Sequence, residues 1–250
     1  MELPNVLGSE PEMTAVYAHQ GFCNACGSPA EFRSQSHWFR DNLFCSVCGS
    51  IPRERALATV LERVRPDWRD RRIHESSPAD RSISARLARE CRSYVASQFF
   101  PGEPLGTVVR GFRNENLEAQ TFEDGRFDLV VTLDVMEHVN EPDKVFREVF
   151  RTLVPGGAYL FSVPTYKERV TSERRARYRP DGGIDHLAEP EYHGNPVSDA
   201  GSLVTFHYGY DLPELIHAWA GFDVELFRFH HHHLGLIGEF TEIYLATRPA

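Results

Sequence analysis

The sequence predicts an α/β protein in which a mainly parallel sheet is covered by helices on both faces and is preceded by a small cysteine-rich module. From residue 71 onward, apolar strand-like runs alternate with amphipathic helical segments, which is typical of parallel sheets. Before residue 52, four of the five cysteines form two Cys-x-x-Cys pairs. The 250 residues are 41% hydrophobic, which is enough for one sizeable core with a small appendage.

The charge and hydropathy of the sequence indicate which kinds of binding partner to expect. The formal net charge of -9 argues against a surface built to neutralise phosphates, so nucleic acid is an unlikely partner. The first residues lack a basic start followed by an apolar run, and no apolar stretch is long enough to cross a bilayer. We therefore expect a cytoplasmic protein without a membrane partner, whose oligomeric state the sequence does not indicate.

The paired cysteines predict a zinc-binding module over residues 21–52, after an amino-terminal extension over residues 1–20. The expected ligands are Cys23, Cys26, Cys45 and Cys48. Two residues between ligands let one tight turn direct both thiolates at one ion, and a glycine follows each pair. Four thiolates close the coordination sphere, so the zinc is expected to be structural. The alternative is a set of unrelated reduced thiols.

The remaining elements follow in chain order. Residues 30–44 alternate apolar and polar side chains and predict short hairpin strands within the module. Residues 53–70 predict a connecting helix, because apolar residues recur there at helical spacing. In the main domain, 71–250, we expect helices at 81–91 and 141–153 and strands at 71–75, 93–100, 106–110, 126–134 and 158–164.

One segment of the main domain has a specific pattern. Residues 122–164 read FEDGRFDLVVTLDVMEHVNEPDKVFREVFRTLVPGGAYLFSVP. Their strand, acidic-His pair, helix, Pro-Gly-Gly turn and second strand resemble the centre of a class I S-adenosylmethionine-dependent methyltransferase. A weaker agreement extends over the main domain, where 221–230 and 239–248 resemble the family's terminal antiparallel strand pair. The resemblance implies a Rossmann-like, seven-stranded methyltransferase sheet.

The resemblance also implies where S-adenosylmethionine binds. In the family, an acidic residue at the end of the first strand precedes a glycine-rich loop, whereas Glu75 precedes a loop without glycine. A Cβ makes positive φ costly, so we expect this loop to be reshaped. Serine and glutamine stand where a ribose-binding acid is usual. The implied cofactor-binding residues are Glu75, Ser76, Ser77, Ala79, Ser97, Gln98, Asn116, Leu117 and Asp134.

The acceptor is expected to bind beyond the carboxyl ends of the strands. Asp134, Glu137 and His138 directly follow the fourth strand and could orient the acceptor or remove its proton. For Glu137 and His138, the alternative is packing and capping at the start of a helix. The long insertion 165–210 is predicted to fold over the sheet as a cap.

The insertion is rich in aromatic and imidazole side chains. We expect four of them to line the acceptor pocket and one to act as the base: His186, Tyr192, His193 and His207. The alternatives are that they only pack the loop, or that a second metal is bound by His186, Glu191 and His193. The run His230–His233 is predicted to lie on a strand, with an inward-facing pair near the sheet edge or the pocket.

The expected activity is transfer of a methyl group from S-adenosylmethionine to an oxygen or nitrogen of a small-molecule or carbohydrate-type acceptor. The basic run 173–179 could contact an anionic substrate, although such runs are usually solvated. One alternative is a ribosomal or transfer-RNA methyltransferase. Another is a non-catalytic cofactor-binding or interaction module in which the reshaped loop no longer supports transfer.

Overall fold

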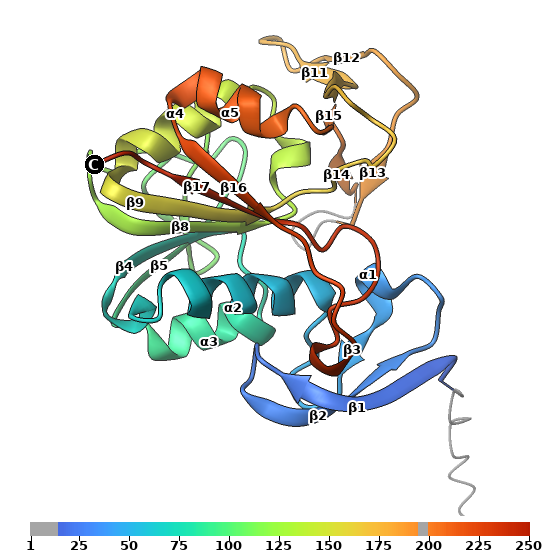
Figure 1. Ribbon diagram of the computed structural model, residues 1–250. Helices are drawn as coiled ribbons and strands as arrows, with labels where there is room; N and C mark the ends of the chain where they lie inside the picture. Colours follow the sequence, from blue (N-terminus) through green and yellow to red (C-terminus); the bar gives the residue numbers. More distant parts are fainter. Residues whose placement is uncertain (1–14, 195–199) are drawn as a thin grey trace, which may run out of the picture.

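The chain is represented by a computed structural model that describes residues 15–194 and 200–250 (Figure 1). Its centre is a mixed eight-stranded sheet. In spatial order the strands are β16 (Asp223–Phe227), β17 (Ile243–Thr247), β9 (Leu153–Ser162), β8 (Phe127–Leu133), β4 (Arg72–Ser76), β5 (Ser93–Gln98), β7 (Phe112–Asn114) and β6 (Val108–Val109).

The strand order confirms the predicted fold class. Strands β7, β5, β4, β8 and β9 are parallel, and β17 and β16 complete the expected seven with antiparallel pairing. The segment predicted as a strand at 106–110 contributes only the two-residue edge strand β6, which pairs antiparallel with β7. The carboxyl ends of the parallel strands therefore lie together at one edge of the sheet.

Helices cover both faces of this sheet. Helices α2 (Pro52–Val64) and α3 (Ser82–Glu90) lie on one face, and α4 (Pro142–Thr152) and α5 (Leu212–Ala220) lie on the other (Figure 1). Strand β8 alternates accordingly: Leu129 and Val131 pack in the core cluster that includes residues of α2 and α3, whereas Val130 packs in the one that includes residues of α4 and α5.

Helix α2 does more than connect the two parts of the chain. Its side chains Leu57, Val60 and Leu61 are fully buried in the core beneath the sheet. Each such leucine or valine contributes roughly 1.5–3 kcal/mol of apolar burial. Helix α2 therefore belongs to the layer that covers the sheet, and the amino-terminal module is attached directly to this layer.

We call residues 15–51 the cysteine module. It contains β1 (Tyr17–Cys23), β2 (Ser28–Ser34), helix α1 (Phe39–Asn42) and β3 (Phe44–Cys45), and its sheet order is β1-β2-β3. The hairpin expected within 30–44 is present as the β2–β3 pair with α1 between its strands, but β1 is the longer partner of β2. Strand β1 begins at Tyr17, inside the range 1–20 that the sequence predicts as an extension.

A buried arginine joins the module to the rest of the fold. Arg55 of α2 is fully buried, and its guanidinium donates hydrogen bonds to the carbonyls of Ser50, Leu43 (3.0 Å) and Gly235 (2.8 Å). It also lies over the ring of Phe32, 4.5 Å from the centroid. The module, α2 and the segment before β17 thus share one buried polar contact.

The predicted strand at His230–His233 is wrong. Strand β16 ends at Phe227, and His232–Leu234 form a short 3-10 helix that Gly235 ends at a φ of +62°. All four histidines are exposed, and this helix packs on β1 of the cysteine module. Gly21 permits the approach, because a Cβ there would lie 2.2 Å from the carbonyl oxygen of His233.

We call residues 165–210 the cap. Its described part forms three two-stranded sheets: β10–β15 (Glu173–Arg174 with Phe206–His207), β11–β12 (Ala176–Tyr178 with Ile184–His186) and β13–β14 (Tyr192–His193 with Ser202–Leu203). The cap is anchored on the short 3-10 helix Met136–His138 that follows β8. The Thr205 amide donates to the Glu137 carbonyl (2.7 Å) and the Tyr208 hydroxyl to the Met136 carbonyl (3.0 Å).

Within the described ranges, no helix combines the length and the hydropathy that crossing a lipid bilayer would require.

Candidate active site

Asp134 lies at the carboxyl end of β8, where the cysteine module reaches the sheet. Its carboxylate pairs with Arg40 of α1 and with Nε of Arg53 of α2 (2.9 Å), and it accepts a hydrogen bond from Ser162 Oγ (2.7 Å). Burial alone would raise the pKa of Asp134, but the Arg53 and Arg40 charges outweigh it and hold the pKa below its ordinary value. The residue predicted to contact the cofactor therefore holds the module against the sheet.

Three predicted acceptor residues meet directly after this point. The Glu137 carboxylate oxygen Oε1 lies 3.8 Å from Nε2 of His138 and 3.8 Å from Nδ1 of His193. The two imidazole rings are edge to face, with centroids 5.1 Å apart. Glu137 and His138 come from the segment after β8, and His193 comes from β13 of the cap. The structure thus brings together residues from both sides of the expected acceptor region.

Hydrogen bonds fix the orientation of both rings. Nδ1 of His138 is 2.9 Å from the Leu203 carbonyl, which can only accept, so Nδ1 carries the proton and Nε2 faces Glu137 with a lone pair. Nε2 of His193 is 3.2 Å from the Glu191 carboxylate, so its Nδ1 faces Glu137 in the same way. Burial lowers the pKa of His138, which favours the neutral ring.

The Glu137 carboxylate is isolated. Its side chain is almost fully buried, and neither oxygen has a hydrogen-bond partner among the described residues. Burial, reinforced by the charge of Asp134, raises the pKa of Glu137 well above its ordinary value. A buried carboxyl group without partners is costly in its charged form, so a proton or a cation is needed to balance it.

His207 lies next to Glu191, outside the cluster of Glu137, His138 and His193. Its Nε2 lies 2.8 Å from the other oxygen of Glu191, and its ring stacks on Tyr166 at 4.1 Å. Tyr166 in turn contacts Phe240, whose ring lies 5.6 Å from the Arg40 guanidinium. Phe240 has a left-handed φ of +53°. The cap, the segment before β17 and the cysteine module therefore meet in one aromatic contact.

The structure does not bring His186 and Tyr192 into the cluster. Successive strand residues point to opposite faces, so Tyr192 turns outward when His193 turns inward, and Tyr192 is 52% exposed. His186 is exposed on the β11–β12 hairpin, at the outer end of the cap (Figure 1).

The basic run 173–179 is compensated by neighbouring acids. Arg174 and Arg177 lie 2.9 and 3.9 Å from Glu141. Arg175 and Arg179 also have carboxylate neighbours, in Glu191 and in Asp181 and Asp185. The run therefore does not present an uncompensated positive patch to a polyanion.

The loop between β4 and α3 follows a glycine-like path without glycine. Ser77 in this loop and Ser82, the first residue of α3, have φ values of +58° and +57°, in the left-handed region. The Ser77 amide is held by the Ser97 carbonyl at 2.8 Å. Left-handed φ costs a residue with a Cβ on the order of 1 kcal/mol. Ser76 is buried and Ala79 half-buried along this path.

Most polar side chains predicted to bind the cofactor are used inside the protein. Glu75 accepts hydrogen bonds from Ser84 Oγ (2.5 Å) and Tyr94 OH (2.7 Å). Ser97 Oγ bonds to His74 (2.8 Å), the Asn116 amide oxygen accepts the Glu118 amide (2.9 Å), and Leu117 is buried. Three polar residues of this set make no side-chain hydrogen bond within the described chain: the buried Ser76 and the half-buried Ser77 and Gln98.

Glu75 gives a pH-dependent prediction. Burial raises its pKa from 4.5 to about 7, so its protonated form contributes stability that is present below pH 4.5 and lost as the pH rises through 7. Glu75→Gln stays neutral. We expect the free energy of unfolding of the variant, relative to the parent, to rise by about 3 kcal/mol between pH 4.5 and pH 8. Urea denaturation at both pH values measures this, with Glu225→Gln as the surface control. If the difference in free energy of unfolding between variant and parent were the same at both pH values, the raised pKa of Glu75 would be contradicted.

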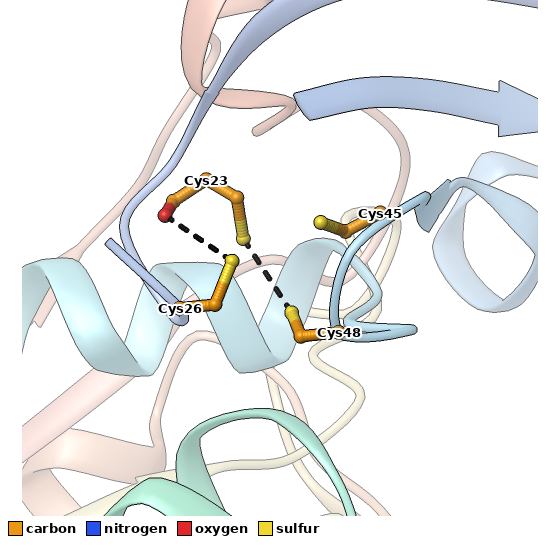
Figure 2. A group of neighbouring side chains, drawn as sticks. All are labelled: Cys23, Cys26, Cys45 and Cys48. Carbon is orange, nitrogen blue, oxygen red and sulfur yellow. Dashed lines mark hydrogen bonds between the residues drawn. The ribbon is translucent and has the colours of Figure 1, made fainter. Parts of the chain in front are cut away.

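The four paired cysteines form a separate cluster in the cysteine module. Figure 2 shows their sulfur atoms turned toward a common centre, and the four atoms lie within 4.8 Å of one another. The Sγ atoms of Cys23 and Cys48 are 3.7 Å apart. Gly27 and Gly49 adopt φ values of +70° and +66° in the two turns that follow the pairs. Their amides bond to the carbonyls of the first cysteine of each pair, at 2.7 and 2.9 Å.

Several residues of this region were not identified from the sequence. Arg40, Arg53, Tyr166 and Phe240 have no motif, and their contacts join segments far apart in the chain. The sequence indicates Glu191 only as a metal ligand with His186 and His193, whereas Glu191 bonds to His193 and His207. The one signal in the sequence for the contact between Glu191 and His193 is that the two residues are two positions apart.

Comparison with known proteins finds similarity to methyltransferases. Residues 82–161 match the family model of the methyltransferase domain. The chain superposes, with a TM-score of 0.50, on a chain from the complex of the Haloferax volcanii Trm112 methyltransferase activator with a protein described as a methyltransferase. That alignment has 13% identity and covers 79% of this chain and 91% of the other, which shows the shared fold. The chain therefore has a Rossmann-like fold, and its residues 82–161 are similar to the methyltransferase domain.

Two curated relatives match part of this domain. Norajmaline N-methyltransferase of Rauvolfia serpentina is 35% identical over 60 residues, which are 24% of this chain and 20% of the relative. Phosphoethanolamine N-methyltransferase of Triticum aestivum is 30% identical over 90 residues, 36% of this chain and 18% of the relative. The matched segments thus span about a fifth of the length of these relatives.

Proposed function

We propose that this chain transfers the methyl group of S-adenosylmethionine to an oxygen or nitrogen of a small-molecule or carbohydrate-type acceptor. The observation that carries the proposal is the convergence of Glu137, His138 and His193 beyond the carboxyl end of β8, on a methyltransferase domain. This is the side of the sheet where such folds bind their ligands.

The loop after β4 and the end of β5 have groups that could bind the cofactor. Ser77 takes the left-handed conformation that a glycine would take, so the backbone can approach a ligand as closely as in a glycine loop. Glu75 and Ser97 hold this loop and its neighbouring strands in place. The Gln98 amide at the end of β5 would then bind the ribose hydroxyls.

When bound, the cofactor would supply an electrophilic methyl group to the acceptor atom. The residues of the cluster would orient the acceptor. Nε2 of His138 and Nδ1 of His193 each present a lone pair on the same side as Glu137, so one nitrogen can orient the acceptor while the other takes the proton that the acceptor loses. The cap covers this site and limits the access of water.

A small acceptor is supported by charge and by the relatives. The formal net charge is -9, and the arginines of the basic run have carboxylate partners, so the surface is poorly suited to a nucleic acid. The two curated relatives are named for small nitrogen-containing acceptors.

We also propose that the cysteine cluster holds one structural zinc ion. Zinc-sulfur bonds of about 2.3 Å in a tetrahedron place sulfur atoms roughly 3.8 Å apart, close to the 3.7 Å between Cys23 and Cys48. Four thiolates leave no position for substrate. The zinc would therefore stabilise the module that holds Arg40 against Asp134, and it would not take part in the transfer.

Calorimetry and product analysis test the methyl transfer. We expect heat of binding with S-adenosylmethionine and with S-adenosylhomocysteine. With a panel of small hydroxyl and amine acceptors, we expect His138→Ala and His193→Ala to lower S-adenosylhomocysteine production at least about 100-fold. The exposed His217 of α5 provides the matched control, His217→Ala. Absence of heat with either ligand would contradict cofactor binding, and salt-dependent binding of RNA would favour the nucleic-acid alternative.

A further inference from the structure

We propose that Glu137, His138 and His193 bind a divalent transition-metal ion, with Glu191 and the Leu203 carbonyl orienting the two imidazole ligands. This site is distinct from the four-cysteine cluster. It also differs from the set of His186, Glu191 and His193 considered from the sequence, because His186 lies elsewhere on the cap. The site joins two residues after β8 with one residue of the cap.

The distances between the donor atoms suit an ion better than direct hydrogen bonds. Oε1 of Glu137 is 3.8 Å from each facing ring nitrogen, whereas a hydrogen bond between such atoms is about 2.7–3.2 Å long. Two ligand atoms that each lie about 2.1 Å from one metal can be up to about 4.2 Å apart. All three ligand atoms lie within 4.8 Å of one another.

The carboxylate of Glu137 is the second, independent observation. The residue is 1% exposed, and neither of its oxygens accepts or donates a hydrogen bond in the described chain. The nearby positive charges of Arg40 and Arg53 are already paired with Asp134. A cation between Glu137 and the two histidines would give this buried group a partner that the protein alone does not provide.

The groups behind the ligands have the arrangement that is usual around metal-bound histidines. Such a histidine donates its remaining N–H to a carbonyl or a carboxylate, which fixes the tautomer and directs the other nitrogen at the metal. The Leu203 carbonyl does this for His138 (2.9 Å), and the Glu191 carboxylate does it for His193 (3.2 Å). His207 holds the second oxygen of Glu191 at 2.8 Å.

The donor set indicates the class of ion. Two imidazole nitrogens and one carboxylate favour zinc, iron(II), cobalt(II) or manganese(II) and leave open coordination positions. The role of the ion rests on the proposed function: an open position would hold the oxygen or nitrogen of the acceptor. With the ion bound, the two ring nitrogens would be ligands and not bases. The charge of the ion would then lower the pKa of the acceptor, whose proton would leave to water. Binding of the ion itself does not depend on that function, because it needs neither cofactor nor acceptor.

Cobalt(II) is a suitable probe of this site in the full chain. The protein is prepared with one zinc ion in the cysteine cluster, and cobalt(II) is then added in the absence of cofactor. We expect one further ion per chain, with the weak visible bands of nitrogen and oxygen ligands and without the intense near-ultraviolet absorption of a cobalt-thiolate bond. Glu137→Gln and His193→Ala are expected to weaken binding at least about 100-fold, and Glu191→Gln about 10- to 100-fold.

Control variants separate this site from other imidazoles. The exposed run His230–His233 could also bind cobalt, so the cobalt absorption bands must persist in the double variant His230→Ala/His231→Ala. The variant His217→Ala controls for the loss of one surface imidazole. Thermal denaturation of each variant without cobalt shows whether it is folded. Retained binding in both Glu137→Gln and His193→Ala, or no second ion in the parent chain, would overturn the proposal. Cobalt binding without heat from S-adenosylmethionine would leave the metal site standing and refute the proposed function.

Discussion

A chain in which Cys45 and Cys48 are both replaced by serine is expected to lose its zinc ion and to become at least about 5 kcal/mol less stable. Structural zinc contributes about 10 to 16 kcal/mol to folding in small zinc-finger peptides. Here the buried residues Phe32 and Leu43 of the module belong to the same core cluster as Leu57 and Leu61 of α2. Loss of the ion therefore exposes part of the main core. Metal content by mass spectrometry and urea denaturation measure the two effects.

The fifth cysteine provides the control for this experiment. Cys91 is buried outside the cluster, and its Sγ lies 3.2 Å from the Arg71 carbonyl. We expect Cys91→Ser to keep the zinc ion and to cost about 1 kcal/mol. A parent chain that is folded and stable without metal would contradict the zinc assignment.

The second large effect is expected for Asp134→Asn. The side chains of Asp134, Arg40 and Arg53 are only 14%, 11% and 18% exposed. Removing this carboxylate leaves two buried guanidiniums with only the partly exposed Asp41 as a counter-charge, and breaking such a buried pair typically costs about 3–5 kcal/mol. Urea denaturation of the zinc-loaded chain measures this loss.

A surface pair of the same chemistry provides the comparison. Asp143 of α4 pairs with Arg147 one turn later, and that arginine is 56% exposed. Asp143→Asn is expected to change stability by less than about 0.5 kcal/mol. If both variants lost the same stability, the ion pairs of Asp134 would not hold the module against the sheet.

Features of the fold that depend on local pattern could be predicted from the sequence. The alternation of strands and helices indicated the sheet, and the spacing of the cysteines indicated that Cys23 and Cys48 would lie together. The segment 122–164 also placed Glu137 and His138 correctly after β8. In each case the determining residues are close in sequence or follow a fixed periodicity.

Features that depend on contacts between distant segments could not be predicted. Arg40 meets Asp134 across 94 residues, and no pattern in the chain marks that pair. The sequence pattern predicts a strand at His230–His233, yet the position of this run is set by packing on β1. His193 reaches the cluster, while Tyr192 does not, because the register of the β13–β14 pair decides which side chain faces inward.

The hydrogen bonds of Arg55 have a consequence for synthesis of the chain on the ribosome. Its guanidinium needs the carbonyl of Gly235, which is 180 residues further along the chain. At about 5–20 residues per second, the ribosome reaches that residue roughly 10 to 40 s after Arg55. Until then, the hydrogen-bond acceptors of the arginine are the carbonyls of Ser50 and Leu43 and the Ser50 hydroxyl. The cysteine module is therefore translated before the sheet but is completed only after residue 235 has been synthesised.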